Sequence, residues 1–176
     1  FRRVLFRSVA TRRLLDHCRG SGVSLFIHTS TPSVTFSTDP IRGGDESLSY
    51  STEKFSAYAT TKALAEQEVL RANDASGMRT IALRPHLVWG AGDPHLLPRV
   101  VSRHRAGRLR IVGDGTNQVD LTHLDNVTHA HLQALRAMLA NPALGGKPYF
   151  IGQNEPVSLW SWLNEIFVAI GLPRVE

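Results

Sequence analysis

Two short apolar segments enclose a long helical pattern, and this succession limits the folds that the chain can adopt. The segments 23–28 (VSLFIH) and 79–84 (RTIALR) are rich in apolar and β-branched residues, which is typical of buried strands. Residues 55–74 between them contain neither Gly nor Pro and are rich in Ala, Leu, Glu and Gln, which favour helix. A strand, a helix and a strand in this order predict a βαβ unit, and therefore a parallel sheet in an α/β fold.

The alternation of helical and strand patterns continues along the rest of the chain. Two predicted helices cover 9–19 and 96–106. A third is capped by Asp125 or Asn126 and ends at Leu139, and a fourth is capped by Ser158 and ends at Ile170. The predicted strands cover 109–112 and 149–151. We expect Leu14, Leu15 and Cys18 to face the core from the first helix. Residues 36–54 are polar and predict a long surface loop of the kind that is often functional.

Tyr58 and Lys62 are the first candidates for chemistry. They are four residues apart on the predicted helix, which places them on one face with roughly 6 Å between their Cβ atoms. A free tyrosine titrates near ~10, and a neighbouring ammonium favours the phenolate. The pair could then pass a proton to or from a carbonyl or alcohol oxygen. The alternative is an ordinary amphipathic helix on which the tyrosine packs and the lysine is solvated.

The loops that follow the two predicted strands are the next candidates. Residues 29–35 (TSTPSVT) form a hydroxyl-rich cluster after the first strand, and residues 85–94 form a Gly- and Pro-containing loop after the second. In open α/β sheets, sites form beyond the carboxyl ends of the strands. A hydroxyl of the first loop could therefore donate to a substrate oxygen held beside Tyr58. The alternative is an ordinary polar turn, because Ser and Thr are common in turns.

Taken together, these motifs resemble those of the extended short-chain dehydrogenase/reductases. Residues 29–31 resemble the Ser/Thr loop of that family, Tyr58-x-x-x-Lys62 its catalytic pair, 83–90 (LRPHLVWG) its segment beside the nicotinamide, and 113–127 a later motif. The chain is most similar to the 3β-hydroxysteroid dehydrogenase branch. Within it, the segments TPSVT, ALAEQ and ANDAS resemble the bacterial members that reduce 2-alkyl-3-oxoalkanoates.

The resemblance implies a Rossmann-like, doubly wound parallel sheet, represented by its C-terminal part, with a small substrate-binding α/β region. Residues 9–88 are then the C-terminal half of the dinucleotide-binding domain. Residues 89–176 are mostly the substrate-binding region, with elements that return to the sheet. The implied cofactor is NADP or NAD, with a slight preference for NADPH, and the implied partner is a lipid-like small molecule. A homodimer through the helix that contains Tyr58 is also implied.

The resemblance also implies a role for each candidate residue. Tyr58 donates a proton to the ketone oxygen, Lys62 assists it and binds the nicotinamide ribose, and Thr31 donates to the same oxygen. The implied cofactor-binding residues are Tyr58, Lys62, Thr29, Pro85, His86, Leu87 and Val88, and the implied substrate-binding residues are Thr31, Ser33 and Trp89. The expected reaction is reduction of the ketone of a β-keto acid by hydride transfer.

Three other functions stay open. A 3β-hydroxysteroid or sterol-4α-carboxylate 3-dehydrogenase is the first alternative. A nucleotide-sugar epimerase or dehydratase is the second, but Val119 stands where those enzymes tend to carry a diphosphate-binding Arg, and His86 and Leu87 stand where they tend to carry an Asn. A non-catalytic protein that kept the fold is the third, and the presence of Tyr58 and Lys62 argues against it.

The chain also differs from a complete member of the resembled family. A glycine fingerprint after a first strand is missing, because Gly20 and Gly22 follow a helical pattern. We therefore expect a piece of a longer protein, without the pyrophosphate site and the catalytic Asn, and with exposed apolar faces on the strands at 23–28 and 80–83. Residues 1–8 (FRRVLFRS) match the translation of a common sequencing adapter, and we expect them to be an artefact.

Composition excludes several other classes of function. The net charge of +5 includes Arg2, Arg3 and Arg7 and falls to about +2 without them, so a nucleic-acid partner is not expected. The local basic run at 99–110 predicts a solvated helix face, with an anion-binding patch as the alternative. The chain has a single cysteine, no His or Cys spacing typical of a metal site, and no apolar run of about 18 residues. We expect a cytoplasmic protein without a metal or a membrane span.

Overall fold

A computed structural model describes residues 2–52 and 56–176, with side chains from Ser8 onward within these ranges. The chain divides into two compact units. The first unit comprises Phe1–Pro85 and Thr128–Ile151, and the second unit comprises His86–Val127 and Gly152–Glu176. Each unit is described by itself below.

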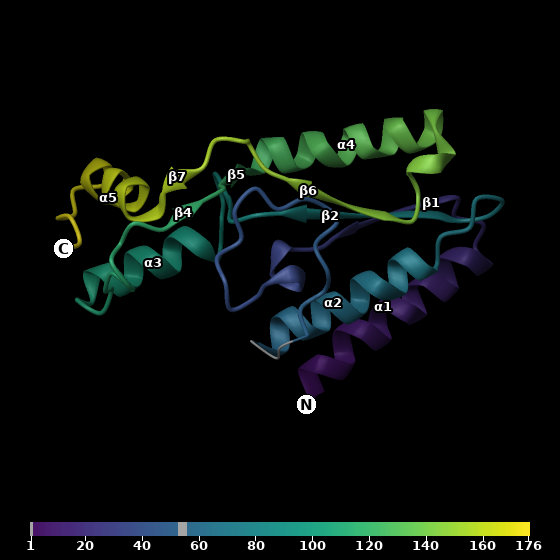
Figure 1. Cartoon of the computed structure of the whole chain (residues 1–176), viewed down its shortest axis with the longest axis horizontal. Coiled ribbons are helices and arrows are strands. Elements are labelled where there is room, and N and C mark those ends of the chain that lie inside the picture. The colour runs from purple at the N-terminus through teal and green to yellow at the C-terminus, as the bar shows by residue number, and fades with distance from the viewer. Residues whose placement is uncertain (1, 53–55) are drawn as a thin grey trace. The chain divides into compact units, whose positions relative to one another are not determined.

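A three-stranded parallel sheet forms the centre of the first unit (Figure 1). Its strands are β1 (Leu25–Thr29), β2 (Arg79–Pro85) and β6 (Lys147–Ile151), in the order β1-β2-β6. The parallel pairing places Thr29 opposite Leu83, which confirms the predicted βαβ unit. The first strand begins two residues later than predicted, because the Val23 N–H donates to the carbonyl of Cys18 in the turn that closes the preceding helix.

Helices α1 (Arg2–Gly20) and α2 (Ala57–Arg71) cover one face of this sheet (Figure 1). A cluster of buried apolar residues fills the space between them: Leu15, Val69, Ala72 and Met78, with Cys18 and Phe26 packed against it. Leu15 and Cys18 are three residues apart and share the inner face of α1. The prediction that Leu14 also faces inward is wrong, because it lies about 100° around the helix and is 51% exposed.

Helix α4 (Leu124–Ala140) covers the opposite face of the sheet with its residues from Thr128 onward. It begins one residue before Asp125, so the predicted cap lies in its first turn. Its Ala134 and Met138 pack against Ile81 and Leu83. The expectation that residues 80–83 expose an apolar face is wrong, since helices on both sides leave these residues at most 4% exposed. The strand β1 is half-buried along most of its length.

The long segment between β1 and α2 is irregular, as predicted. After the short 3-10 helix η1 (Pro32–Thr35), residues 36–52 contain no helix or strand, and Lys54 lies outside the described residues. The segment is attached to the rest of the unit, because the Ser51 N–H donates to the carbonyl of Val34 and the Phe150 N–H donates to the Glu46 carboxylate. A second 3-10 helix, η2 (Pro142–Leu144), leads into β6.

The second unit is built from short pieces. β3 (Val88–Trp89) pairs with β5 (Thr122–His123) in parallel, and β4 (Gln118–Val119) pairs with β7 (Val157–Ser158) in antiparallel fashion. Its helices are α3 (Leu96–Arg105) and α5 (Leu159–Ala169), and its core consists of Trp160, Leu163 and Phe167. The predicted strand at 109–112 is wrong. Its apolar residues Leu109 and Ile111 pack against this core instead of joining a ladder.

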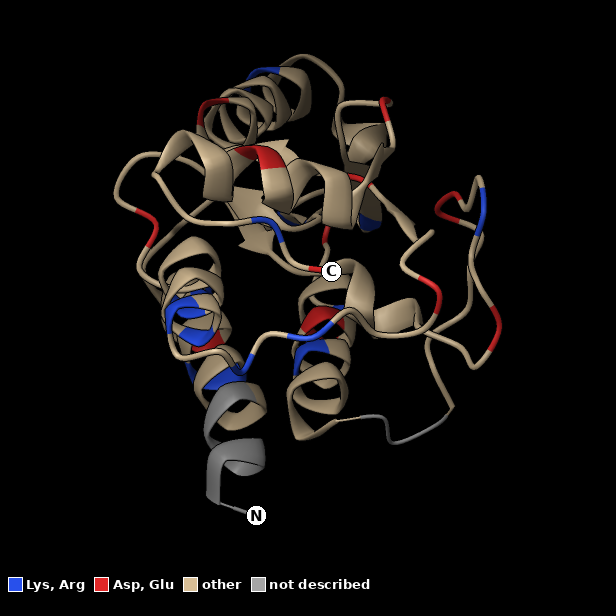
Figure 2. Ribbon diagram, turned by 90° about the vertical axis from the view of Figure 1, so that its left-hand side faces the viewer, with Lys and Arg blue, Asp and Glu red and all other residues tan. Residues whose placement is uncertain are grey.

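Charged residues of both signs are interspersed along the helices and loops (Figure 2). None of the helices among the described residues is long and apolar enough to cross a membrane.

Candidate functional site

The catalytic candidates lie on the first two turns of α2. Ser56 caps this helix, since its hydroxyl accepts a hydrogen bond from the Ala59 N–H at 3.0 Å. Tyr58 lies two residues after this cap and is 47% exposed, and Lys62 lies one turn later and is half-buried. The predicted helix is confirmed. Its capped start fixes where the phenol leaves the helix, because Tyr58 is the second helical residue.

Lys62 connects this helix to the carboxyl end of β1. Its ammonium donates to the main-chain carbonyl of Thr29 at 2.5 Å. The Thr29 hydroxyl forms a hydrogen bond of 2.8 Å with Nε2 of His131, which lies on α4. Thr29 therefore contacts elements on both faces of the sheet. The structure brings together Lys62 and Thr29, two of the predicted cofactor-binding residues, at the edge of the sheet where sites of open α/β folds form.

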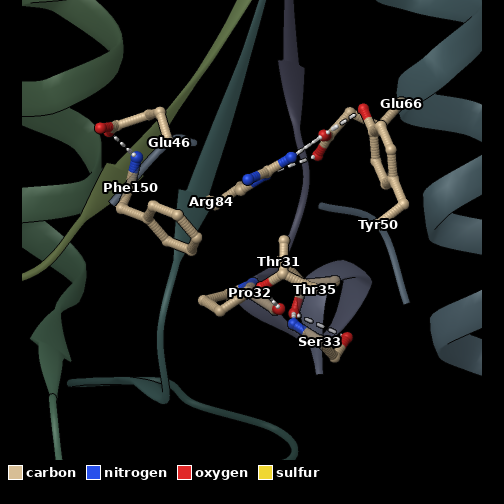
Figure 3. A network of polar contacts seen from close by, with 9 residues as sticks. All are labelled: Thr31, Pro32, Ser33, Thr35, Glu46, Tyr50, Glu66, Arg84 and Phe150. Carbon is tan, nitrogen blue, oxygen red and sulfur yellow. Dashed lines mark hydrogen bonds and ion pairs between the residues drawn. The ribbon is translucent and has the colours of Figure 1, made fainter. Parts of the chain in front are cut away.

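Thr31 and Ser33 lie just beyond the same strand, at the start of η1 (Figure 3). Thr31 caps this short helix, because its hydroxyl oxygen accepts from the Ser33 N–H at 3.4 Å and lies 3.1 Å from the Ser33 hydroxyl. The Thr35 hydroxyl donates to the carbonyl of Pro32 at 2.9 Å. These bonds fix the shape of the hydroxyl loop. A hydrogen bond from Thr31 to a substrate oxygen stays a prediction.

Sequence reasoning missed a buried polar cluster beneath α2. Arg84 of β2 and Glu66 of α2 form an ion pair, and the Tyr50 hydroxyl donates to Glu66 at 2.8 Å (Figure 3). Burial by itself raises the pKa of Glu66, but hydrogen bonds from Arg84 and other groups outweigh it and lower the pKa. The Ser30 hydroxyl contributes to this lowering, although it makes no hydrogen bond of ordinary geometry. Burial and the Glu66 carboxylate raise the pKa of Tyr50.

A signal for this cluster was present in the sequence. Arg84 is a charged residue that directly follows the apolar run 81–83 of the predicted strand, and Glu66 follows Lys62 by one helical turn. A charged residue in a buried strand needs a partner. The sequence does not show how α2 packs on β2, and this packing makes Glu66, and not Glu68, the partner of Arg84.

His28 of β1 is a half-buried titratable group in the first unit. Burial, followed by the nearby charge of Lys62, lowers the pKa of His28 to about 4. Its Nε2 has no hydrogen-bond partner among the described residues. The imidazole is therefore neutral at physiological pH and contributes no charge beside Lys62.

The remaining predicted residues begin at the end of β2. Pro85 ends the first of the two segments that form the first unit, and His86, Leu87 and Val88 belong to the second unit. Leu87 has a positive φ of 39°, a conformation that is rare outside glycine, and its carbonyl accepts a hydrogen bond from the Thr122 N–H at 3.4 Å. Burial lowers the pKa of His86, although the charge of Asp120 opposes this.

Trp89 lies in an aromatic cluster within the second unit. Its ring meets those of His123 and Trp162 edge to face, with centroid distances of 4.9 Å and 5.5 Å. Its indole nitrogen is buried without a hydrogen-bond partner among the described residues. Trp89 is therefore half-buried and packed against other aromatic rings of the unit, and its contact with a substrate stays a prediction. The described residues contain no group of His, Cys, Asp or Glu side chains that could hold a metal ion.

Comparisons with known proteins agree with the motifs. The chain is 46% identical to the 2-alkyl-3-oxoalkanoate reductase of Stenotrophomonas maltophilia over 170 residues, which is 96% of this chain and 51% of that protein. It is 37% identical to the mouse (Mus musculus) sterol-4-alpha-carboxylate 3-dehydrogenase, over 97% of this chain and 47% of that protein. The chain therefore spans about half the length of these curated relatives.

Solved structures show the same fold. A dTDP-glucose 4,6-dehydratase from Streptomyces venezuelae, with NAD and TYD bound, matches at a TM-score of 0.71 and 25% identity, over 94% of this chain and 51% of that one. An epimerase from Methanothermobacter thermautotrophicus matches at a TM-score of 0.79 and 19% identity, over 98% and 52%. The fold is thus the predicted α/β, Rossmann-like one. The model of the 3-beta hydroxysteroid dehydrogenase/isomerase family matches residues 7–176, and the chain belongs to that family.

Proposed function

We propose that the whole protein is an NAD(P)-dependent reductase that converts the ketone of a 2-alkyl-3-oxoalkanoate into the 3-hydroxy acid. The observation that supports this best is the contact between the Lys62 ammonium and the Thr29 carbonyl. It holds the Tyr-Lys helix against the carboxyl end of a parallel strand, where an open α/β sheet binds its ligand. The proposal concerns the whole protein, since this chain spans about half of its relatives.

The residues of this end of the sheet fit a nicotinamide nucleotide. Lys62 offers an ammonium and Thr29 and Thr31 offer hydroxyls, which suit the hydroxyl groups of a ribose. When bound, the cofactor supplies the hydride that reduces the carbonyl carbon. Tyr58 donates its phenolic proton to the carbonyl oxygen. Lys62 lies one turn away on the same face of α2, and its charge favours the phenolate that this donation leaves behind.

The substrate class rests on the relatives and on Val119. A relative that is 46% identical is named for 2-alkyl-3-oxoalkanoates, and a second bearing the same name is 43% identical. Val119 is a half-buried residue of β4 and pairs with Val157. An apolar side chain at this position cannot bind a diphosphate as an arginine does, and it suits an alkyl chain.

A sterol-4α-carboxylate or 3β-hydroxysteroid substrate is the second candidate, because relatives with such names are 35% to 38% identical. The two substrate classes share a 3-oxo or 3-hydroxy group on an apolar body. The same Tyr58 and Lys62 chemistry would serve both. The preference for NADPH, the homodimer through α2 and the cytoplasmic location stay predictions.

A panel of substrates tests the proposal. A full-length protein that contains this segment is assayed with a long-chain 2-alkyl-3-oxo acid, a 3β-hydroxysteroid and a UDP-sugar, each with both nicotinamide cofactors. We expect turnover of the 2-alkyl-3-oxo acid. Turnover of the steroid alone would favour the second candidate, and turnover of the UDP-sugar alone would contradict the interpretation of Val119.

A further inference from the structure

Glu66 of α2 and Arg84 of β2 form a fully buried ion pair, with side chains that are 0% and 2% exposed. The Arg84 Nε lies 3.1 Å and 3.2 Å from the two carboxylate oxygens, and Nη2 donates to Oε1 at 2.5 Å. Two nitrogens of the guanidinium take part, so the pair uses the planar fork of an arginine. A lysine offers a single ammonium and cannot reproduce this geometry.

Stability alone does not explain such a pair. Removing two charges from water costs several kcal/mol per ion, and replacing a buried pair by apolar residues of similar volume is often neutral or stabilising. Directional hydrogen bonds, in contrast, fix the position of one element relative to another. The location of the pair therefore indicates its use.

The pair lies one helical turn from the catalytic candidates. Glu66 follows Lys62 by four residues on α2, and Arg84 follows Leu83 on β2. Leu83 is the residue that pairs with Thr29, whose carbonyl accepts the Lys62 ammonium. The helix is thus attached to the ends of two adjacent strands by two polar contacts, one at Lys62 and one at Glu66.

Aromatic rings enclose the guanidinium. The Arg84 Cζ lies 5.6 Å from the ring centroid of Tyr50 and 5.0 Å from that of Phe150 (Figure 3). Its Nη1 is buried and has no hydrogen-bond partner among the described residues, and rings at these distances favour a cation through their π faces. Tyr50 also donates to Glu66. It thereby ties the irregular segment that precedes α2 to the same carboxylate.

We propose that Glu66 and Arg84 are positioning residues for the Tyr58–Lys62 pair, and that Tyr50 assists them through its hydrogen bond to Glu66. The bond between them sets the height and rotation of α2 over β2, and so holds the phenol where a carbonyl oxygen is protonated. This rests on the proposed function. Neither residue touches the reacting atoms. Removing either one lets α2 shift or rotate over β2, which misplaces the Tyr58 phenol.

The test compares Glu66→Gln and Arg84→Lys with Glu68→Gln in the full-length protein. Glu68 lies on the same helix and forms an exposed ion pair with Arg12 at 2.9 Å, which makes it a matched control. We expect Glu66→Gln and Arg84→Lys to lower kcat per folded molecule by about 10–100-fold, since a misplacement of about 1 Å can cost that much. KM should change less than about threefold. Glu68→Gln should behave as wild type.

Two more variants separate positioning from folding. The double variant Glu66→Met/Arg84→Met removes both charges and keeps the volume, so it should fold, yet its flexible side chains specify no position. We expect its kcat to stay as low as that of Glu66→Gln. Tyr50→Phe should lower kcat by a few-fold. A double variant with wild-type kcat would overturn the proposal, as would a folded Glu66→Gln enzyme with wild-type kcat.

Hydrogen exchange makes the result independent of the reaction. We expect the amides of residues 60–66 to exchange about tenfold faster in Glu66→Gln than in Glu68→Gln, because the helix loses an attachment to the sheet. If the wild-type protein reduces none of the ketones while this exchange difference is present, the proposed function fails and the positioning of α2 stands. Equal exchange in the two variants would contradict the positioning role.

Discussion

The two units of the molecule hold their candidate residues by different means. In the first unit, polar side chains are buried between regular elements: six of the seven buried polar or charged residues among those described lie there, the exception being Thr122. In the second unit, an aromatic and aliphatic core supports strands of two residues each. The contrast teaches that the residues proposed for proton transfer lie in a unit whose helices and sheet are joined by buried hydrogen bonds. The substrate-side candidates rest on packing, which tolerates variation in side-chain shape.

The largest expected effect is at Lys62. Lys62→Gln keeps a hydrogen-bond donor for the Thr29 carbonyl but removes the charge, so kcat should fall by about 10²-fold or more, with KM changed less. Steady-state kinetics of the full-length protein measure this. Arg71→Gln, an exposed cation on the same helix, is the control and should leave kcat unchanged. Equal kcat values for the two variants would contradict the proposed role of the Lys62 charge.

The core of the second unit should be the next most sensitive point. Phe167 is fully buried, and Phe167→Ala should lower the free energy of unfolding by about 3–5 kcal/mol through the cavity it leaves. Its neighbour Val168 is 52% exposed, and Val168→Ala should cost less than about 0.5 kcal/mol. Denaturation by urea measures both. Similar costs at the two positions would show that this unit is not held by its aromatic core.

A pH effect should mark the first unit. The folded protein keeps His28 neutral down to its pKa of about 4, whereas the unfolded chain takes up a proton near pH ~6.5. The contribution of His28 is therefore fully present above pH ~6.5 and is lost as the pH falls toward 4, by about 2–3 kcal/mol. His28→Gln should flatten this part of the stability profile. The exposed His17→Gln should not, and an unchanged profile in His28→Gln would refute the assignment.

The smallest expected effects concern Asp93 and Ser56, whose side chains accept hydrogen bonds from N–H groups at the starts of α3 and α2. Asp93 accepts hydrogen bonds from the N–H groups of His95, Leu96 and Leu97 at 2.8–3.1 Å, and these outweigh burial and lower its pKa. Asp93→Ala and Ser56→Ala should each lower the free energy of unfolding by about 1 kcal/mol. Only Ser56→Ala should also lower kcat, because α2 holds Tyr58. If Asp93→Ala lost activity and Ser56→Ala did not, the second unit, and not the first, would hold the residues that control kcat.

The regular elements of the first unit could be predicted because each is a continuous pattern in the sequence. Helix α2 is a run of helix-forming residues over 15 positions, and strand β2 is a mainly apolar run over 7. The strands of the second unit could not be predicted, since two residues form no pattern. β4 exists because Val119 pairs with Val157, which lies 38 positions further along the chain.

The candidate site was predictable in part for the same reason. Tyr58 and Lys62 are related by local helix geometry, which a spacing reveals. The bond between Thr29 and His131 joins residues 102 positions apart, and the pair of Arg84 with Glu66 depends on how a helix packs on a strand. Such contacts follow from tertiary packing, and no local pattern indicates the partner.

The central claim is that Tyr58 of α2 is the proton donor of a ketone reductase, and Tyr58→Phe tests it most directly. The full-length variant and the wild-type protein are compared with a long-chain 2-alkyl-3-oxo acid under single-turnover conditions, with rates expressed per folded molecule. We expect the rate of ketone reduction to fall by about 10²–10⁴-fold, with a smaller change in substrate affinity, because only the acidic hydroxyl is removed. A Tyr58→Phe protein that reduces the ketone at a near-wild-type rate would contradict the account.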